Sequence, residues 1–448
     1  MTYVRTTGPV IAPTKPVLPP VVMAPNPVPS EEDKERSAWL FKFCLAYAFI
    51  MLVFLNYAAV LPLVQREWGL SNSGAGMIFS AYQVGYIASS FILSYLTDRI
   101  KARSIFMVSA VWSVVANLLF ALLAVDQNSA VIYRALAGLG MGGTYMPGLK
   151  LVADRFPSAQ RGRAVGYFTS AFVFGAAAST LLSGTVGSLA GWRFAIMTTA
   201  AGCLVGTLLC VPILQDDHGV SAGDAGKRLR LDVLRSKPAV LMIVAYAAHM
   251  WEQYGMRAWM ATFLAASFLQ LGFTKTEATG WGASLTAIIV AAGGFATGLA
   301  GIVSDRIGRT RTASAIMVIS ACFSLGFGWL MGLHPVVLVV VGLLYSFFVV
   351  AETPVLSTGL TELAPPHSLG AAMGFQTLVG FVAATASPMI FGLILDRTNV
   401  ALSSNQNALP TVWGWAFGIL GIGALIGPTV LAIVRRLPAS AQMAGGKR

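Results

Sequence analysis

Long apolar runs recur along this chain and limit the folds that it can adopt. Twelve runs are apolar enough and long enough to cross a bilayer as helices, which takes about 20 residues each. They lie near residues 39–64, 73–96, 104–124, 130–153, 164–189, 193–214, 238–268, 278–303, 311–332, 335–359, 371–395 and 411–435. The pattern therefore predicts an all-α integral membrane protein with about twelve transmembrane helices.

The charge content leads to the same conclusion. Charged residues make up 11% of the 448 residues, whereas soluble proteins average about 25%, so this composition cannot build a water-exposed surface. The net charge of +12 would suit a nucleic-acid partner, but the lysines and arginines lie in short clusters between the apolar runs. That placement is typical of the cytoplasmic loops of membrane proteins. The expected partner is the lipid bilayer, and no nucleic acid is expected.

Polar segments divide the chain into five parts. The first contains eight prolines between Pro9 and Pro29 and then a charged run, so it is predicted to be disordered. A central polar loop separates two blocks of six apolar runs. The predicted parts are a cytoplasmic tail 1–38, a six-helix bundle 39–214, a cytoplasmic loop 215–237, a second six-helix bundle 238–436 and a cytoplasmic tail 437–448.

The basic residues of the short loops predict the orientation in the membrane. Alternate loops contain clusters of three: Arg99, Lys101 and Arg103; Arg155, Arg161 and Arg163; Arg306, Arg309 and Arg311. Loops on the opposite side contain one each: Arg66, Arg193, Lys275 and Arg397. Loops rich in lysine and arginine stay in the cytoplasm. Both termini are therefore predicted to be cytoplasmic in a multi-pass protein of the plasma or inner membrane.

The two blocks also share a sequence repeat. Asp98-Arg99-Ile100 recurs 207 residues later as Asp305-Arg306-Ile307. With a shift of 208 residues, Asp154, Pro157, Gly162 and Gly166 correspond to Glu362, Pro365, Gly370 and Gly374. A parallel repeat of six helices predicts two pseudo-symmetric bundles, as in one group of secondary transporters.

Two motifs sharpen this prediction. The loop pattern Gly-x-x-x-Asp-Arg-x-Gly-Arg-x-Arg is nearly complete in the second half, as Gly301, Asp305, Arg306, Gly308, Arg309 and Arg311. The first half keeps Asp98, Arg99 and Arg103, with Ser94 and Lys101 in place of the glycines. The fourth run combines an arginine with glycines, as Arg134, Gly138, Gly140, Gly142 and Gly143. With these motifs the chain resembles the major facilitator superfamily over about 400 residues, which implies that fold and secondary transport.

The loop motif predicts a gating latch. An aspartate at a helix end, near basic residues and a neighbouring helix N-terminus, can join two bundles by charge-assisted hydrogen bonds. The expected pairs are Asp98 with Arg155, and Asp305 with Arg306 or Arg309. The full set of latch residues is Asp98, Arg99, Arg103, Asp154, Arg155, Asp305, Arg306, Arg309 and Glu362. Such a latch would close the cytoplasmic side, although the same charges could serve only to set the topology.

Few charged residues fall inside the apolar runs, where a charge is costly unless it is paired or functional. They are Arg134, Lys150, Glu252, Arg257 and Glu352. His249 precedes Glu252 by three residues and shares its helical face. Arg257 follows Glu252 by five residues, roughly 140° around a straight helix, so a direct pair requires unwinding near Gly255.

Three basic and two acidic groups favour an anionic substrate. Arg257 and Arg134 are predicted to bind a carboxylate or similar oxyanion, since guanidinium groups bind oxyanions with two hydrogen bonds. Neutral hydrogen bonds would come from Asn56, Tyr57, Tyr82 and Gln83. Glu252 is predicted to carry a coupling proton, with His249 and Glu352 nearby. Structural alternatives remain: Arg134 could bind backbone carbonyls, Lys150 could extend to the interface, and Glu352 could be satisfied at the Pro354 kink.

The remaining motifs exclude other classes. No Gly-x-x-x-x-Gly-Lys-Ser/Thr loop occurs, so ATP is not expected to drive transport, and neither an enzyme, a cofactor nor a metal site is predicted. The segment Gly175 to Gly184 is a degraded form of a signature of drug antiporters. Three functions stay open: proton-coupled transport of a small anion, proton-driven export of drugs through an aromatic cavity, and a sensor or assembly factor of the same fold. A monomer is expected.

Overall fold

The computed structural model describes residues 30–96, 100–215, 231–364, 369–400 and 409–447. Fourteen α-helices make twelve crossings in this part of the chain, because α1 and α2 form one crossing and α13 and α14 form another. The predicted all-α membrane fold is therefore confirmed. Most of the Pro-rich tail, most of the central loop and the two residues Asp98 and Arg99 lie outside the described residues.

The first half contains α1 (Glu31–Ile50), η1 (Met51–Val53), α2 (Asn56–Trp68), α3 (Asn72–Leu96), α4 (Ala102–Leu123), α5 (Gln127–Arg155), α6 (Ser158–Ala190) and α7 (Trp192–Ile213). The second half contains η2 (Leu231–Arg235), α8 (Lys237–Gln270), α9 (Lys275–Ile307), α10 (Arg309–Phe327), η3 (Gly328–Leu330), α11 (Pro335–Leu363), α12 (Leu369–Thr398), α13 (Gly414–Ala424), α14 (Ile426–Arg436) and η6 (Pro438–Gly446).

Hydropathy and charge content distinguish nine of the crossings from the other three. Nine helical segments of the described chain are long and apolar enough to span a membrane, and α3, α5 and α8 are not among them. The helix α8 shows why, because every residue from Glu252 to Phe268 is buried in protein. A helix surrounded by other helices needs no apolar outer face, so α8 can carry polar residues.

Residues 31–38, which the sequence analysis assigned to a disordered tail, are helical. The helix α1 begins at Glu31, where the Ser30 side chain caps it and the Glu31 carboxylate accepts a 2.6 Å hydrogen bond from the Lys34 Nζ. A capped, salt-bridged first turn forms a helix despite its high charge, because local side-chain pairs stabilise it. The C-terminal segment also packs onto the protein, since Met443 of η6 is 1% exposed.

Capping residues mark some of the other helix ends. Asp126 caps α5, and the Ser129 hydroxyl and backbone N–H donate to its carboxylate, which lowers the pKa of Asp126. Gly69 ends α2 with a left-handed φ of 61°, a conformation that favours glycine. These caps allow the tight reversals that place successive helices side by side.

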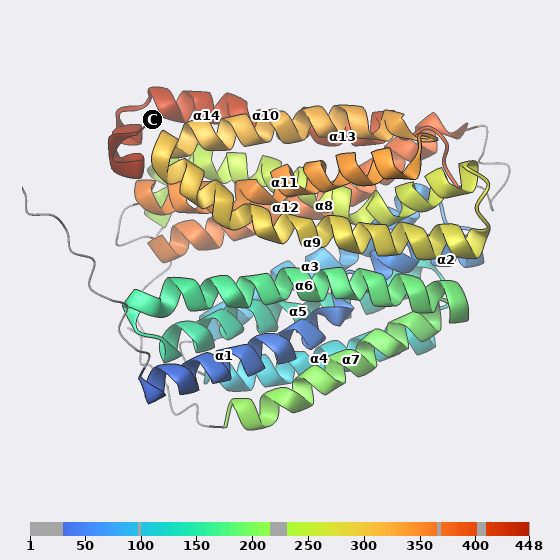
Figure 1. Ribbon diagram of the computed structural model, residues 1–448, viewed down its shortest axis with the longest axis horizontal. Helices are drawn as coiled ribbons and strands as arrows, with labels where there is room; N and C mark the ends of the chain where they lie inside the picture. The colour runs from blue at the N-terminus through green and yellow to red at the C-terminus, as the bar shows by residue number, and fades with distance from the viewer. Residues whose placement is uncertain (1–29, 97–99, 216–230, 365–368, 401–408, 448) are drawn as a thin grey trace, which may run out of the picture.

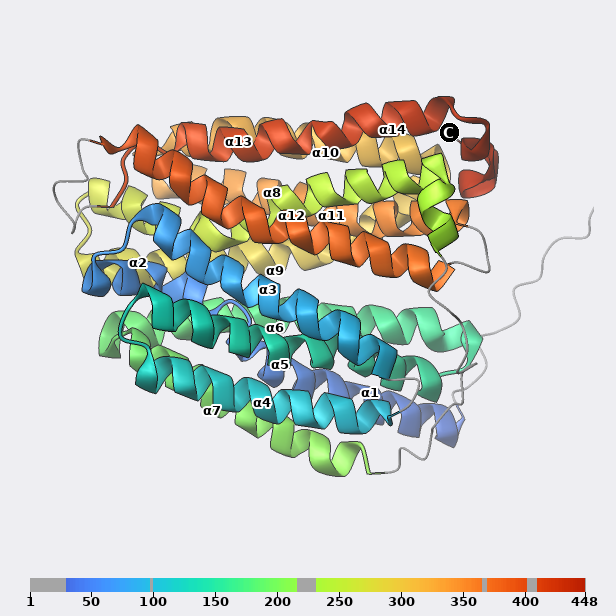
Figure 2. The same ribbon diagram turned by 180° about the vertical axis from the view of Figure 1, so that it is seen from behind.

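The two halves pack as separate bundles whose most extensive contacts are α6 with α9 and α3 with α12, and α2 also touches α8 and α9. Figure 1 shows the first half in blue to green and the second half in yellow-green to red, with α6 beside α9. Figure 2 shows α3 crossing beside α12 on the opposite side. A methyl group on Gly76 of α3 would lie 2.3 Å from the Pro388 carbonyl oxygen, so glycine permits this close approach.

Candidate functional site

Seven polar residues of three helices form a buried hydrogen-bonded group in the second half, which we call the acidic cluster. Its members are His249 and Glu252 of α8, Ser320 and Ser324 of α10, and Tyr345, Glu352 and Thr353 of α11. All except the half-buried Thr353 have at most 1% of their surface exposed. Buried carboxyl groups must find partners within the protein, and here both do.

Ser320 lies between the two carboxyl groups. Its Oγ is 3.0 Å from the Glu252 Oε2 and 2.6 Å from the Glu352 Oε1. A hydroxyl group has one proton, so Ser320 can donate to only one of these carboxyls. The other contact becomes a hydrogen bond when that carboxyl is protonated and donates to the serine oxygen. The geometry therefore suits two carboxyls that hold at least one proton between them.

The outer partners of the carboxyls extend this chain of hydrogen bonds. The His249 Nδ1 lies 2.9 Å from the Glu352 Oε2, and its Nε2 lies 2.8 Å from the Thr353 hydroxyl. On the other side, the Ser324 hydroxyl donates to the Glu252 Oε1 over 2.8 Å and also contacts the Tyr345 hydroxyl. Each carboxyl oxygen thus has a polar partner.

Four members of the acidic cluster were missed by the sequence analysis: Ser320, Ser324, Tyr345 and Thr353. Helical spacing offered a signal, since Ser320 and Ser324 are four residues apart and Tyr345 and Glu352 are seven apart. Serine and tyrosine are common in apolar helices, however, so the spacing gains meaning only when α8, α10 and α11 are known to be neighbours.

Arg257 is separate from the acidic cluster. The helix α8 is continuous from Lys237 to Gln270, so the unwinding expected near Gly255 is wrong, and no ion pair joins Arg257 to Glu252. Gly255 instead permits close packing, because a Cβ there would lie 2.4 Å from a Leu420 methyl group. A straight helix turns the two charged side chains away from each other.

Arg257 has few partners for a buried charge. It is 6% exposed, its guanidinium carbon lies 5.7 Å from the centre of the Tyr254 ring, and its Nε has no hydrogen-bond partner. Within the described residues, no carboxylate forms an ion pair with it.

Arg134 has a similar environment in the first half. Its Nη1 donates a 3.1 Å hydrogen bond to the Asn56 Oδ1, and its guanidinium carbon lies 4.5 Å from the centre of the Tyr82 ring. It is 1% exposed and its Nε lacks a partner. The described chain supplies no ion pair here either, and the contacts are to side chains rather than to the backbone carbonyls considered above.

The four neutral residues of the predicted binding site differ in whether their polar atoms already have hydrogen-bond partners. The Asn56 amide donates to Asn117 and Thr199, and the Tyr57 hydroxyl donates to the Ala75 carbonyl over 3.1 Å. By contrast, the Tyr82 hydroxyl and the Gln83 Oε1 are buried without a partner. Tyr82 and Gln83 therefore retain hydrogen-bonding capacity, whereas Asn56 and Tyr57 mainly hold other groups in place.

A row of aromatic rings connects the two arginines across the halves. Arg134 packs on Tyr82, and Tyr86 follows one turn later on α3. The ring centres of Tyr86 and Phe381 of α12 are 4.5 Å apart, and those of Phe381 and Tyr254 are 5.4 Å apart. Tyr254 is the ring beside Arg257. Both arginines thus border one aromatic path that runs between the bundles.

The loop-motif residues of the second half pair within that half. Arg309 contacts Asp305 at 2.5 Å and Glu362 at 2.9 Å, and the backbone N–H of Ala444 also donates to Glu362. These groups belong to α9, α10, α11 and the C-terminal segment, while Arg306 is exposed. The second-half ion pairs therefore join helices of one bundle and the C-terminal segment, not two bundles as expected.

The first-half loop residues also differ from the expected latch. Asp154 pairs with Lys150 at 3.3 Å, the Arg155 guanidinium lies 4.6 Å from the centre of the Trp39 ring, and Arg103 is half-buried. The predicted partners Asp98 and Arg99 lie outside the described residues. A pair of Arg155 with Asp98 stays a prediction.

A contact between the halves occurs at the opposite ends of the helices. The Asp396 carboxylate of α12 accepts hydrogen bonds from the backbone N–H groups of Asn72 and Ser73, at 2.8 and 2.9 Å. It also accepts one from the Asn72 side chain at 2.8 Å. These residues start α3, so a carboxylate of one half caps a helix N-terminus of the other, where the helix dipole favours negative charge.

No group of three or more histidine, cysteine, aspartate or glutamate side chains that could hold a metal ion occurs among the residues described.

Comparisons with known proteins agree with this architecture. The family model described as "Major Facilitator Superfamily" matches residues 43–388 and 254–447. A relative from Cupriavidus necator, "Probable sulfoacetate transporter SauU", is 27% identical over 88% of this chain and 93% of its own length. The "Hexuronate transporter" of Bacillus subtilis is 22% identical over 75% of this chain and 82% of its own length.

A solved structure of a bacterial homologue of the human lysosomal transporter Spinster, described as inward-facing and occupied, has the same fold. It superposes with a TM-score of 0.70 at 16% identity, over 90% of this chain and 97% of the other. The two bundles, the repeated loop motif and the family match lead to one conclusion. The chain belongs to the major facilitator superfamily and is a secondary transporter, not an enzyme.

Proposed function

We propose that this transporter moves a small organic anion across the membrane in a process coupled to protons. The observation that carries the proposal is the separation of buried charges. Arg257 and Arg134 are buried without a carboxylate partner among the described residues, whereas Glu252 and Glu352 are engaged in the acidic cluster. The positive groups are thus available to a ligand and the negative groups are not.

Electrostatics favour an anionic ligand at the arginines. A buried charge without a partner is destabilising by several kcal/mol, and an anion that binds it relieves this penalty. Guanidinium groups also present parallel N–H donors that match a carboxylate or sulfonate. The names of two relatives, a sulfoacetate transporter and a hexuronate transporter, point to anionic substrates as well.

The acidic cluster, which includes Glu252 of the helix that carries Arg257, supplies a proton store. A proton on Glu352 can donate to Ser320, whose own proton then points to Glu252, and the reverse arrangement places the proton on Glu252. This exchange moves one proton between the carboxyls without moving heavy atoms. Because α8 carries both Glu252 and Arg257, a shift of this rigid helix on substrate binding would alter the acidic cluster, which is the coupling that we propose.

Drug export receives less support. It requires a wide aromatic cavity lined by Trp251, Trp259 and Phe263, yet Trp259 and Phe263 are fully buried in the packed core and Trp251 is half-buried. The Trp259 indole donates to the Pro388 carbonyl over 3.0 Å, and its ring stacks on Phe391.

If the protein were a sensor or assembly factor of the same fold, neutralising the buried charges should have no effect. Cytoplasmic termini and a monomeric state are part of the proposal.

The first experiment tests the anion site. Purified protein is screened by thermal shift against small carboxylates, sulfonates and lipophilic cations, because a ligand that binds the folded state raises its apparent stability. Arg257→Ala should weaken binding of the stabilising anion about 30-fold or more, as expected for loss of a buried charge contact. Arg193→Ala is the control, since Arg193 is a partly exposed arginine that pairs with Glu67.

A second experiment, with protein reconstituted in liposomes, tests proton coupling. Glu252→Gln should abolish uptake driven by a pH gradient and leave counterflow of the anion intact, because it removes a proton carrier but no anion contact. Stabilisation by lipophilic cations alone would contradict the anion assignment. Gradient-driven uptake that survives in Glu252→Gln would contradict the proton assignment.

A further inference from the structure

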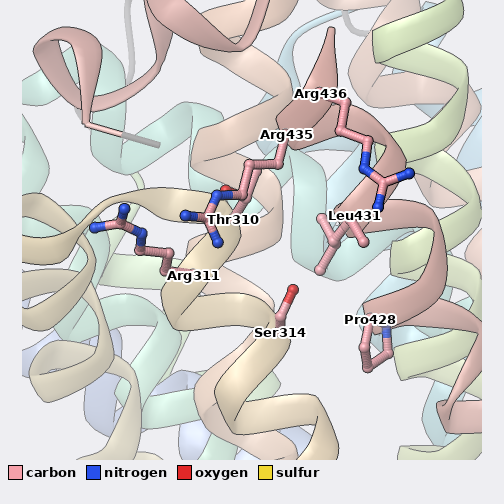
Figure 3. A pocket seen from close by; sticks show the side chains of 8 residues that line it. Thr310, Arg311, Ser314, Pro428, Leu431, Arg435 and Arg436 are labelled. Atoms are coloured by element: carbon pink, nitrogen blue, oxygen red, sulfur yellow. The ribbon is translucent and has the colours of Figure 1, made fainter.

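A basic pocket lies apart from the acidic cluster and from the two buried arginines. It has a volume of about 730 Å³ and opens between the start of α10 and the end of α14 (Figure 3). Its walls are Thr310, Arg311, Ser314, Pro428, Leu431, Ala432, Arg435 and Arg436. Figure 3 shows Arg435 of α14 extending toward the start of α10 near Thr310, and the Ser314 hydroxyl between the two helices, while the Arg311 and Arg436 side chains extend to opposite sides of the pocket.

The charge of this pocket is uncompensated. Three of the lining residues are arginines and none is acidic. Arg311, Arg435 and Arg436 are exposed, and none forms an ion pair within the part of the chain that the structure describes. The pocket also adjoins the N-terminal turn of α10, whose free backbone N–H groups add positive potential. The local field therefore favours a negatively charged ligand.

A buried hydroxyl group points to the same conclusion independently of the arginines. Thr310 lines the pocket, is only 2% exposed, and its Oγ1 has no hydrogen-bond partner. Buried hydroxyls are normally hydrogen-bonded, so this one has a donor available for a ligand in the pocket. A phosphate oxygen in the pocket would accept its proton.

The other walls favour a lipid over a free anion. Pro428, Leu431 and Ala432 give the α14 side of the pocket an apolar surface. The same two helices expose apolar side chains, with Ile426 51%, Ile433 40% and Val318 42% exposed, as expected where acyl chains touch the protein. We propose that the pocket binds the phosphate headgroup of an anionic phospholipid, with an acyl chain along α14. Basic pockets between transmembrane helices bind such headgroups elsewhere.

A bound headgroup would connect α10 to α14. The helix α10 also carries Ser320, which joins the two carboxyls of the acidic cluster. Lipid binding at the start of α10 would therefore stabilise the position of the helix that carries the Ser320 hydroxyl. This inference does not depend on the proposed substrate, because binding can be measured without transport.

Native mass spectrometry of the full-length protein tests the proposal. The protein is incubated with phosphatidylglycerol, with neutral phosphatidylcholine or with inorganic phosphate, and bound species are counted. Wild type should retain phosphatidylglycerol preferentially, and the double variant Arg435→Gln with Arg436→Gln should bind it about ten-fold more weakly. The matched control is Arg161→Gln with Arg163→Gln, two exposed arginines at the start of α6 and outside the pocket.

The outcomes separate the sources of the ligand. Equal losses of phosphatidylglycerol retention in both double variants would mean that retention follows total surface charge, and would overturn the assignment of the pocket as the lipid site. Inorganic phosphate bound as tightly as phosphatidylglycerol would overturn the lipid assignment. Thr310→Val guards against a folding artefact, because it removes a hydroxyl without a partner: it should unfold at no lower temperature than wild type and yet retain less phosphatidylglycerol. Unchanged retention in Thr310→Val and in the Arg435/Arg436 variant would refute the proposal.

Discussion

At the residue scale, one serine determines how the two buried carboxyl groups interact. The Ser320 Oγ lies within hydrogen-bond distance of both Glu252 and Glu352. No other hydroxyl of the acidic cluster contacts both carboxyls: Ser324 contacts Glu252, and Thr353 reaches Glu352 only through His249. The two carboxyls can thus exchange a proton through a single short bridge.

We therefore expect Ser320→Ala to reduce pH-gradient-driven uptake about ten-fold, which corresponds to the loss of one charge-assisted hydrogen bond. Counterflow of the anion should change little, because the anion does not contact Ser320 in the proposed mechanism. Ser320→Thr keeps the hydroxyl and should restore most of the uptake. Uptake measured in proteoliposomes decides the question: equal activity of the alanine and threonine variants would mean that the hydroxyl does not relay protons.

At the scale of elements, a contact between two helix ends connects the two halves of the chain. The N-terminus of α3 and the end of α12 belong to different halves, and Asp396 connects them through the backbone of Asn72 and Ser73. This contact holds the halves together at the end that contains the α2–α3 turn. At the other ends of α6 and α12, a methyl group on Gly166 or Gly374 would meet no atom within 4 Å, so those ends are less closely packed.

Asp396→Asn should favour states in which the halves separate at the α3 end. A carboxylate at a helix N-terminus contributes about 1 kcal/mol, so the population of separated states should rise about five-fold. Spin labels at the exposed positions Ser71 and Arg397 would report this as a larger fraction of long distances. Asp154→Asn is the matched control, because Asp154 pairs with Lys150 inside one half. An unchanged distance distribution in Asp396→Asn would show that the contact does not hold the halves together.

At the scale of the whole molecule, the two bundles meet at a row of aromatic rings. The arginine of each half borders the aromatic row formed by Tyr82, Tyr86, Phe381 and Tyr254. A substrate between the bundles could contact both arginines, and alternating access would then expose it to one side at a time. The direction of this exchange depends on how the molecule lies in the membrane.

The distribution of basic residues predicts that orientation. Ser71→Cys should react with a membrane-impermeant maleimide in intact cells, because the α2–α3 turn is expected outside. Lys447→Cys should react only after permeabilisation. Both positions are exposed, and the background replaces Cys44 and Cys322, the two native cysteines that are not buried. The reverse labelling pattern would place the termini outside the cytoplasm.

Local sequence patterns were enough to predict an integral membrane protein, its twelve crossings and its family. These depend on apolar runs of helical length and on short motifs, which are local and can be recognised without knowing which helices are neighbours. The sequence also marked Glu252, Glu352, His249, Arg134 and Arg257, because charged or titratable groups in apolar runs are rare.

How these groups pair depends on the packing of the helices, which no local pattern specifies. The serines that bind Glu252 are 68 and 72 residues away, and Glu352 is 103 residues from its partner His249. The same holds for Asp396, which is 324 residues from Asn72. Which distant residues become partners depends on which helices pack together and on the face of each helix that carries the side chain. Neither the helix neighbours nor the facing direction can be predicted from the sequence of one helix alone.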